Sequence, residues 1–207
     1  MIAHESVWRA NVAAETVSVE RLPERWRKQG GRALIPRILL DEIPPGFDPL
    51  GPLNKLIWSV GLLVGHGISS CDRISIGAKS PLTGGVKESN GGGSTGLRLS
   101  HLGIRALVLE GAPGDAGWKL LHLSTEGGVF EPADDLAGLG VDAAAQRLRE
   151  RYGPKVGITL IGPGGEMGLR AAGVQNLDKE GTASRICGRG GLGAVMGSKR
   201  VKAIVID

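Results

Sequence analysis

Glycine-rich segments that also carry basic side chains are the part of this sequence best suited to chemistry. Three stretches qualify, at residues 80–96, 161–166 and 185–199. Glycines that lead into a helix expose backbone N–H groups, and the missing side chains let a phosphate come close. The last stretch opens a basic end of the chain, because residues 185–207 hold five Lys or Arg against one acid. We therefore expect an anion as the natural partner of this segment.

Each of these features also has a plainer interpretation. A single glycine run can be a tight turn, and Gly188–Gly193 gives the G-x-G-x-x-G spacing of a dinucleotide site with no expected strand closely before it. A nucleotide-binding Rossmann domain stays open as a lesser alternative. Cys187 stands among arginines and glycines, where a thiolate would be stabilised, or it fills space beside the loop. The four histidines show no metal-ligand spacing, so we expect structural or surface roles for them.

Short strands and helices must position these loops. Apolar residues at helical spacing predict one helix over 32–42, with Pro36 in its first turn, and a second, amphipathic one over 141–152. Pro23 is expected to open a short basic helix that ends at Gly30. The chain is therefore α+β or α/β and rich in strands. Apolar runs and apolar/polar alternation predict these strands at 7–12, 16–20, 55–60, 72–78, 104–110, 118–123, 156–161 and 201–206.

An internal repeat links two of the loops. Gly96–Glu110 aligns without a gap with Gly193–Asp207, and glycines precede both copies. Each copy predicts a glycine-rich loop, a short helix and a buried strand that ends in an acid. We therefore expect one domain, 1–207, built from two related halves at about 1–111 and 112–207. Two such loops could hold a ligand that itself has two similar halves, whereas coincidence between short apolar strings is the alternative.

Composition limits the class of protein. The 207 residues are 41% hydrophobic, which is enough for one folded domain, and they include 35 glycines but only 3% aromatic side chains. No stretch reads as a signal peptide or a membrane span, so we expect a cytoplasmic protein without a membrane partner. With so few aromatics to stack on bases, we do not expect a nucleic-acid partner. Cys71 and Cys187 cannot supply the four thiolates of an iron–sulfur cluster.

Several blocks together resemble a known family over about residues 7–207. They are Gly30-Gly31-Arg32, Asp48-Pro49-Leu50-Gly51-Pro52, Lys79-Ser80-Pro81-Leu82-Thr83-Gly84, Glu88-Ser89-Asn90, Leu160-Ile161-Gly162-Pro163 and the long block Gly188–Lys199. Their order and spacing resemble the N-terminal domain of the aldehyde ferredoxin oxidoreductases, which are tungsten or molybdenum enzymes with a bis-pterin cofactor. The resemblance implies an α+β fold of two pseudo-twofold-related β-sheets with short helices, on which the metal and its two pterins lie.

The resemblance also implies a site. Backbone carbonyls of Asn90 and Ile186 would hold a magnesium ion that bridges the two pterin phosphates. A divalent cation between phosphates suits carbonyl oxygens, and arginine forks suit the phosphates themselves. No catalytic residue is expected within this chain. The cofactor-binding residues implied are Arg73, Asn90, Gly92, Gly93, Arg185, Ile186, Cys187, Gly188, Arg189 and Gly190.

Some residues depart from the family pattern. The block at Gly30–Pro36 lacks a further glycine after its arginine, the loop Gly93–Gly96 lacks an aromatic residue, and Cys187 stands where alanine is usual. In the family, a 4Fe–4S cluster and the acid and histidine groups near the metal belong to further helical domains. We therefore expect a tungstopterin- or molybdopterin-binding subunit, or a split N-terminal part, of an aldehyde oxidoreductase. A cluster-bearing catalytic partner and a ferredoxin-type electron acceptor are implied. The alternative is a non-catalytic remnant that binds pterin, another phosphorylated ligand or a protein.

Overall fold

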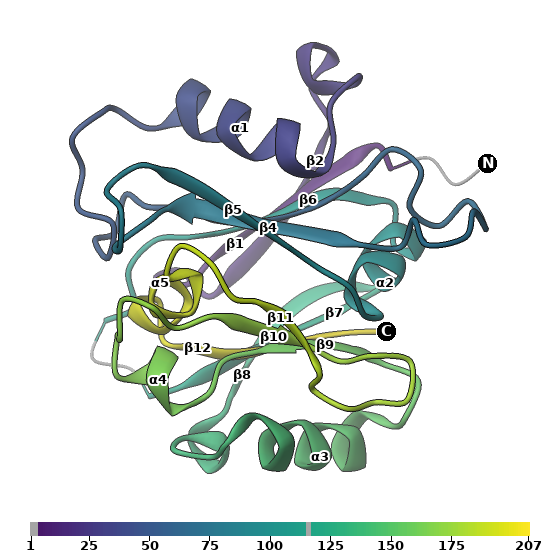
Figure 1. Cartoon of the computed structure of the whole chain (residues 1–207), viewed down its shortest axis with the longest axis vertical. Coiled ribbons are helices and arrows are strands. Elements are labelled where there is room, and N and C mark those ends of the chain that lie inside the picture. Colours follow the sequence, from purple (N-terminus) through teal and green to yellow (C-terminus); the bar gives the residue numbers. More distant parts are fainter. Residues whose placement is uncertain (1–3, 115–116) are drawn as a thin grey trace.

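Two six-stranded sheets stacked face to face make up the domain (Figure 1). The computed structural model describes residues 4–114 and 117–207. The first sheet has the order β2-β1-β6-β3-β4-β5, and the second has the order β11-β10-β9-β12-β7-β8. The strands are β1 (Ser6–Asn11), β2 (Thr16–Arg21), β3 (Leu56–Val60), β4 (Ile74–Lys79), β5 (Val86–Gly91), β6 (Ile104–Glu110), β7 (Lys119–Ser124), β8 (Gly127–Pro132), β9 (Gly157–Leu160), β10 (Val174–Asn176), β11 (Arg185–Cys187) and β12 (Val201–Ile206).

Short helices cover the sheets and fill the space between them. α1 lies on the outer face of the first sheet and α3 on the outer face of the second, while α2 and α5 lie between the two sheets (Figure 1). The N–H of the Trp58 indole donates to Thr159 Oγ1 at 3.3 Å and so links the two inner faces within one shared core. The helices are α1 (Leu34–Glu42), α2 (Thr95–His101), α3 (Val141–Tyr152), α4 (Pro163–Glu166) and α5 (Leu192–Ser198), with 3-10 turns at Glu24–Trp26, Gly31–Ala33 and Asp134–Leu136.

The two sheets repeat one topology, which confirms the predicted fold class. Reading the second sheet backwards matches β8, β7, β12, β9, β10 and β11 to β2, β1, β6, β3, β4 and β5 in turn. Each sheet has a parallel pair at the same place, β1 with β6 and β7 with β12, and both pairs carry a register shift where the strand begins. The shift falls between Ile104 and Ala106 in one pair and between Val201 and Ala203 in the other, which are equivalent positions of the repeat.

The sequence repeat is a structural repeat as well. α2 and α5 begin and end 97 residues apart, and β6 and β12 begin 97 residues apart. The turn between helix and strand needs a left-handed backbone in both copies, with φ of 71° at Gly103 and 53° at Arg200. Such a backbone is uncommon for a residue with a side chain, so the second copy keeps the turn at some cost in strain.

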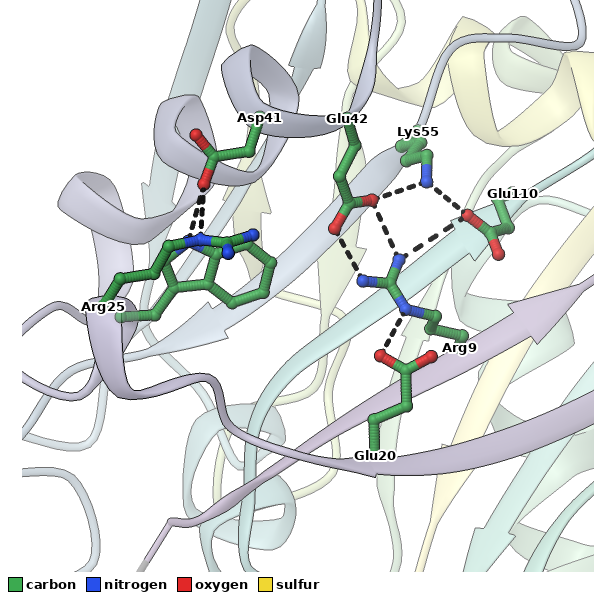
Figure 2. Close-up of polar contacts among 8 residues, drawn as sticks. Arg9, Glu20, Arg25, Asp41, Glu42, Lys55 and Glu110 are labelled. Atoms are coloured by element: carbon green, nitrogen blue, oxygen red, sulfur yellow. Dashed lines mark hydrogen bonds and ion pairs between the residues drawn. The ribbon is translucent and has the colours of Figure 1, made fainter.

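An ionic cluster ties the end of α1 to the first sheet. Arg9 donates to both oxygens of Glu42, at 2.6 and 2.9 Å, and to Glu20 at 2.8 Å, while Lys55 contacts Glu42 at 2.6 Å and Glu110 at 2.7 Å (Figure 2). Burial would lower the pKa of the Arg9 guanidinium, but its carboxylate partners raise it above the ordinary value. The cluster therefore holds a charged arginine under the helix end.

The second half fills the equivalent place with different side chains. His122 replaces Arg9 in the repeat, and its ring nitrogens lie 3.1 Å from Asp207 Oδ1 and 3.6 Å from Glu131 Oε1. α3 ends in Tyr152, whereas α1 ends in Glu42, and the Tyr152 hydroxyl donates to Glu131 Oε2 at 2.8 Å. The two halves thus share their backbone arrangement more closely than their side chains.

Some sequence predictions were wrong in detail. The expected basic helix after Pro23 is only the 3-10 turn at Glu24–Trp26, which buries Trp26. A strand, β11, does directly precede Gly188, although none was expected. β11 pairs antiparallel with β10, and β12 pairs with β9 and β7, so the G-x-G-x-x-G spacing does not open a Rossmann βαβ unit. Four strands were missed: β5, β8, β10 and β11.

Candidate functional site

The two glycine-rich loops begin side by side. The first loop follows β5 and the second follows β11. Each of these strands lies at one edge of its sheet, and the two strands contact each other. A Cβ on Gly91, the last residue of β5, would come within 2.8 Å of Cys187 Sγ in β11. Real Cβ atoms do not approach so closely, so the absence of a side chain at Gly91 is what lets the strands meet. Segments almost a hundred residues apart thereby form one surface.

A cleft at this junction, called cleft one from here on, has a volume of about 340 Å³. Arg73 and Arg185 line it together with Gly92 and Gly93. Arg73 directly precedes β4. Its guanidinium donates to the side-chain oxygen of Asn90 and, at 3.4 Å, to the backbone carbonyl of Asn90. A Cβ on Gly92 would lie 3.7 Å from Arg185 Cδ and 3.9 Å from Arg73 Nη1. The two arginines therefore flank the space that a side chain at position 92 would occupy.

Acidic side chains also line cleft one, namely Asp72, Asp178 and Glu180. The Asp178 carboxylate accepts from Ser184 Oγ at 2.5 Å and from the N–H groups of Thr182 at 2.9 Å and Glu180 at 3.1 Å. These hydrogen bonds hold the pKa of Asp178 below its usual range. Asp178 thus stabilises the conformation of its own loop. Within the described residues, neither Arg73 nor Arg185 forms an ion pair with a carboxylate. Both guanidiniums face the cleft with charge to offer an anion.

A second cleft at the junction, called cleft two, has a volume of about 420 Å³. Gly188 and Arg189 of the second loop line it, and so do Asn90 and Ile186, the pair implied to hold magnesium. The remaining lining residues come from before α1 and from β5: Arg32, Glu88 and Ser89. Asn90 therefore belongs to both clefts, because it lines cleft two and holds the arginine of cleft one.

The structure brings the ten implied site residues together, eight of them as lining. Arg73, Gly92, Gly93 and Arg185 line cleft one, and Asn90, Ile186, Gly188 and Arg189 line cleft two. The remaining two are buried just beside these walls. Gly190 has a φ of +79°, and a Cβ there would lie 2.7 Å from Cβ of Lys87.

Cys187 is fully buried, and its Sγ lies 3.7 Å from Asn176 Nδ2. Burial raises the pKa of the Cys187 thiol to about 12. Of the two interpretations left open by the sequence, the structure therefore favours packing over a stabilised thiolate.

Sequence reasoning missed eight polar residues that line the clefts. They are Ser70, Asp72, Asp178, Lys179 and Glu180 in cleft one and Arg32, Glu88 and Ser89 in cleft two. Arg32 and Glu88 stand in blocks that the sequence already singled out, Gly30-Gly31-Arg32 and Glu88-Ser89-Asn90. No spacing in the sequence places Arg32 beside Arg189, because that neighbourhood arises from the meeting of the two sheets. Among the described residues, no group of three or more His, Cys, Asp or Glu is placed to hold a metal ion.

Comparison with known proteins assigns the chain to a family. Residues 7–207 match the family described as aldehyde ferredoxin oxidoreductase, N-terminal domain. The chain belongs to this family. The tungsten-containing aldehyde ferredoxin oxidoreductase of Pyrococcus furiosus is 36% identical over 202 residues, which cover 96% of this chain and 32% of that protein. The aliphatic sulfonate oxidoreductase, WOR-like subunit, of the same organism is 30% identical over 192 residues, which cover 85% of this chain and 29% of that protein.

A solved structure shares the whole fold of this family domain. It is the active site complex BamBC of benzoyl coenzyme A reductase in complex with 1,5-dienoyl-CoA, with a TM-score of 0.91 and 26% identity. The match covers 99% of this chain and 31% of that one. The chain thus spans about a third of the length of the proteins it matches. Within the described residues no helix could span a bilayer, since the longest, α3, has 12 residues.

Proposed function

We propose that this domain binds the phosphate ends of a tungstopterin or molybdopterin cofactor within an aldehyde-oxidising enzyme. The observation that carries the proposal is the meeting of both glycine-rich loops at one junction, where each loop lines a cleft that contains two arginines. A bis-pterin cofactor has two phosphate ends, and two related loops beside each other suit such a ligand. The tungsten-containing relatives supply the metal class.

The residues present fit such a ligand. At Gly92 and Gly188 an added Cβ would make only ordinary contacts of 3.5 Å or more, so these glycines are not required by close packing. Because these glycines have no side chain, space stays open beside Gly92 in cleft one and beside Gly188 in cleft two. An anion in that space would meet backbone N–H groups and the guanidiniums of Arg73 and Arg185, which form no ion pair within the described part of the chain. Buried phosphate groups need this combination of dipoles and positive charge.

Each side chain of the site has a definite part in this proposal. Arg73 and Arg185 would bind phosphate in cleft one, and Arg189 in cleft two. Asn90 would orient Arg73 through its side-chain oxygen, to which Arg73 already donates. The backbone carbonyls of Asn90 and Ile186 would hold magnesium, which takes oxygen ligands and bridges phosphates. Cys187 and Gly190 would act through the backbone, because both are buried.

The chemistry of the enzyme would come from the cofactor and from residues outside this chain. When bound, the metal and its pterins supply two-electron oxidation of an aldehyde to a carboxylate, with oxygen from water. We propose that a partner subunit or further domain carries a 4Fe–4S cluster and covers the open side of the cofactor. Electrons would leave to a ferredoxin-type acceptor, in the cytoplasm. This chain's own residues bind and orient the cofactor.

Metal and pterin analysis tests the proposal. The protein is purified from its native host with whatever it retains, and tungsten, molybdenum and pterin are measured per mole of chain. We expect one metal and two pterins, together with a cluster-bearing partner. A chain that holds a protein partner but neither metal nor pterin would overturn the proposal in favour of a non-catalytic remnant. Arg73→Ala should lower the pterin content, whereas Arg21→Ala, an exposed arginine on β2 at the opposite edge of the first sheet, should not.

A further inference from the structure

Cleft two contains an arginine and a carboxylate that the site described so far does not use. Arg32 Nε donates to Glu88 Oε2 at 3.0 Å, although the two residues come from the 3-10 turn before α1 and from β5. The Arg32 side chain is 80% exposed, while that of Glu88 is 9% exposed. An exposed arginine gains little from an ion pair at a protein surface. A nearly buried carboxylate, in contrast, costs free energy unless it is paired.

The contacts of Glu88 are incomplete. Its second oxygen, Oε1, is buried and has no hydrogen-bond partner among the described residues. Such an acceptor costs about 1–3 kcal/mol when it is left unsatisfied. Oε1 is enclosed by protein, so the ion pair of Oε2 with Arg32 has to offset the burial of the carboxylate. The rest of cleft two favours an anionic ligand, because Arg32 and Arg189 line it as well and Glu88 is the single acid among the described residues that line it.

We propose that Arg32 and Arg189 form a second phosphate-binding subsite in cleft two, in which Glu88 is a positioning residue for Arg32. This inference rests on the proposed function, and it adds residues that the family resemblance did not assign to the cofactor. Glu88 takes the Nε of Arg32 and leaves the terminal nitrogens of the guanidinium free for phosphate oxygens. The ligand is a phosphate monoester. Cleft one, with Arg73 and Arg185, binds a separate phosphate.

Phosphate titration followed by amide NMR of the full 207-residue chain separates the two clefts. The amides of Gly188 and Arg189 report cleft two, and those of Gly92 and Gly93 report cleft one. Inorganic phosphate is added up to about 50 mM, which populates even a site of millimolar affinity. We expect saturable shifts at both pairs of amides in the wild type.

Arg32→Ala should weaken the affinity reported by Gly188 and Arg189 about tenfold and leave the affinity at Gly92 unchanged. Arg73→Ala should do the reverse, and Arg21→Ala should change neither. No saturable shift at the cleft-two amides of the wild type, or equal losses in Arg32→Ala and Arg21→Ala, would overturn the subsite. Binding in cleft one alone would leave the proposed function standing without this inference.

Glu88→Gln tests the positioning role, because the two explanations predict opposite signs. If Glu88 only repels phosphate, removal of its charge strengthens phosphate binding in cleft two. If Glu88 positions Arg32, the variant weakens binding there several-fold while cleft one is unaffected. Stronger binding in Glu88→Gln would therefore refute positioning. Arg32→Lys is the matched variant, since it keeps the positive charge but loses the fork that Glu88 holds, and it should also weaken binding.

Discussion

Two adjacent glycines, Gly92 and Gly93, allow the ligand site to be tested separately from the fold. A Cβ at Gly92 would make contacts of 3.7 Å or more, all to the side chains of Arg73 and Arg185. A Cβ at Gly93 would overlap the backbone carbonyl of Leu177, and the φ of Gly93 is +105°. Alanine at position 92 therefore intrudes only on cleft one, whereas alanine at position 93 strains the chain itself.

The two substitutions should differ in both stability and binding. Gly92→Ala should leave the free energy of unfolding unchanged or raise it by up to about 1 kcal/mol, because alanine restricts the unfolded chain. Gly93→Ala should lower it by about 3 kcal/mol or more. Its unfavourable φ costs about 1–3 kcal/mol, and the carbonyl overlap adds a similar amount. In binding, the Gly92→Ala methyl group should weaken phosphate affinity in cleft one at least about tenfold, or about 1.4 kcal/mol.

Urea unfolding and phosphate titration on the same samples measure both effects. The buried indoles of Trp26 and Trp58 report unfolding by fluorescence. With a slope of about 1–3 kcal/mol per molar urea, Gly93→Ala should lower the midpoint by about 1 M or more. Wild-type phosphate affinity in Gly92→Ala would refute cleft one as a phosphate site. A loss of stability in Gly92→Ala as large as that in Gly93→Ala would contradict the difference in packing space between positions 92 and 93.

Three further predictions concern titration. Hydrogen bonds from Arg9 and Lys55 outweigh burial and lower the pKa of Glu42, so Glu42→Gln should cost about 1–3 kcal/mol at pH 7. That difference, measured by urea unfolding, should shrink as pH falls below about 4.3. Burial lowers the pKa of Lys199 from 10.5 to about 8. Between these two pH values the unfolded chain keeps the Lys199 proton and the folded chain loses it, so the free energy of unfolding should rise as the pH is raised. Lys199→Met should abolish that rise. Since burial raises the pKa of Cys187 to about 12, Ellman's reagent at pH 8 should modify Cys71 alone until urea is added.

The sequence predicted the elements whose residues face the core. The amphipathic helix at 141–152 appears with the same bounds, and all eight predicted strands exist. Burial imposes apolar patterns on seven of these strands, whereas β2 is mostly exposed and was predicted from its apolar/polar alternation. The four missed strands lack such patterns. β5 is polar and mostly exposed, β8 contains two glycines and a proline, and β10 and β11 have three residues each. They are defined by backbone pairing with a neighbouring strand, and they are too short or too polar for a burial pattern to show in the sequence.

The candidate site was predicted only as far as its motifs reach along the chain. Both glycine-rich loops were identified, and the structure places them together, but the division into two clefts depends on how β5 meets β11. Arg32 joins cleft two through Glu88, a contact across 56 residues that no local pattern encodes. Contacts of this kind follow from the packing of two sheets, so they could not be derived from spacing.

The divergence between the two halves shows which inferences from the internal repeat are safe. The register shift of the parallel pair and the left-handed turn at Gly103 and Arg200 recur, because each is a property of the backbone frame. The side chains on that frame recur only in part. Glu20 and Glu110 have counterparts in Glu131 and Asp207, but Arg9 between them is replaced by His122. A ligand contact made by backbone N–H groups should therefore have a counterpart in the other half. Contacts made by side chains, such as those of Arg32, have to be established one by one, and this is why the two clefts need separate variants.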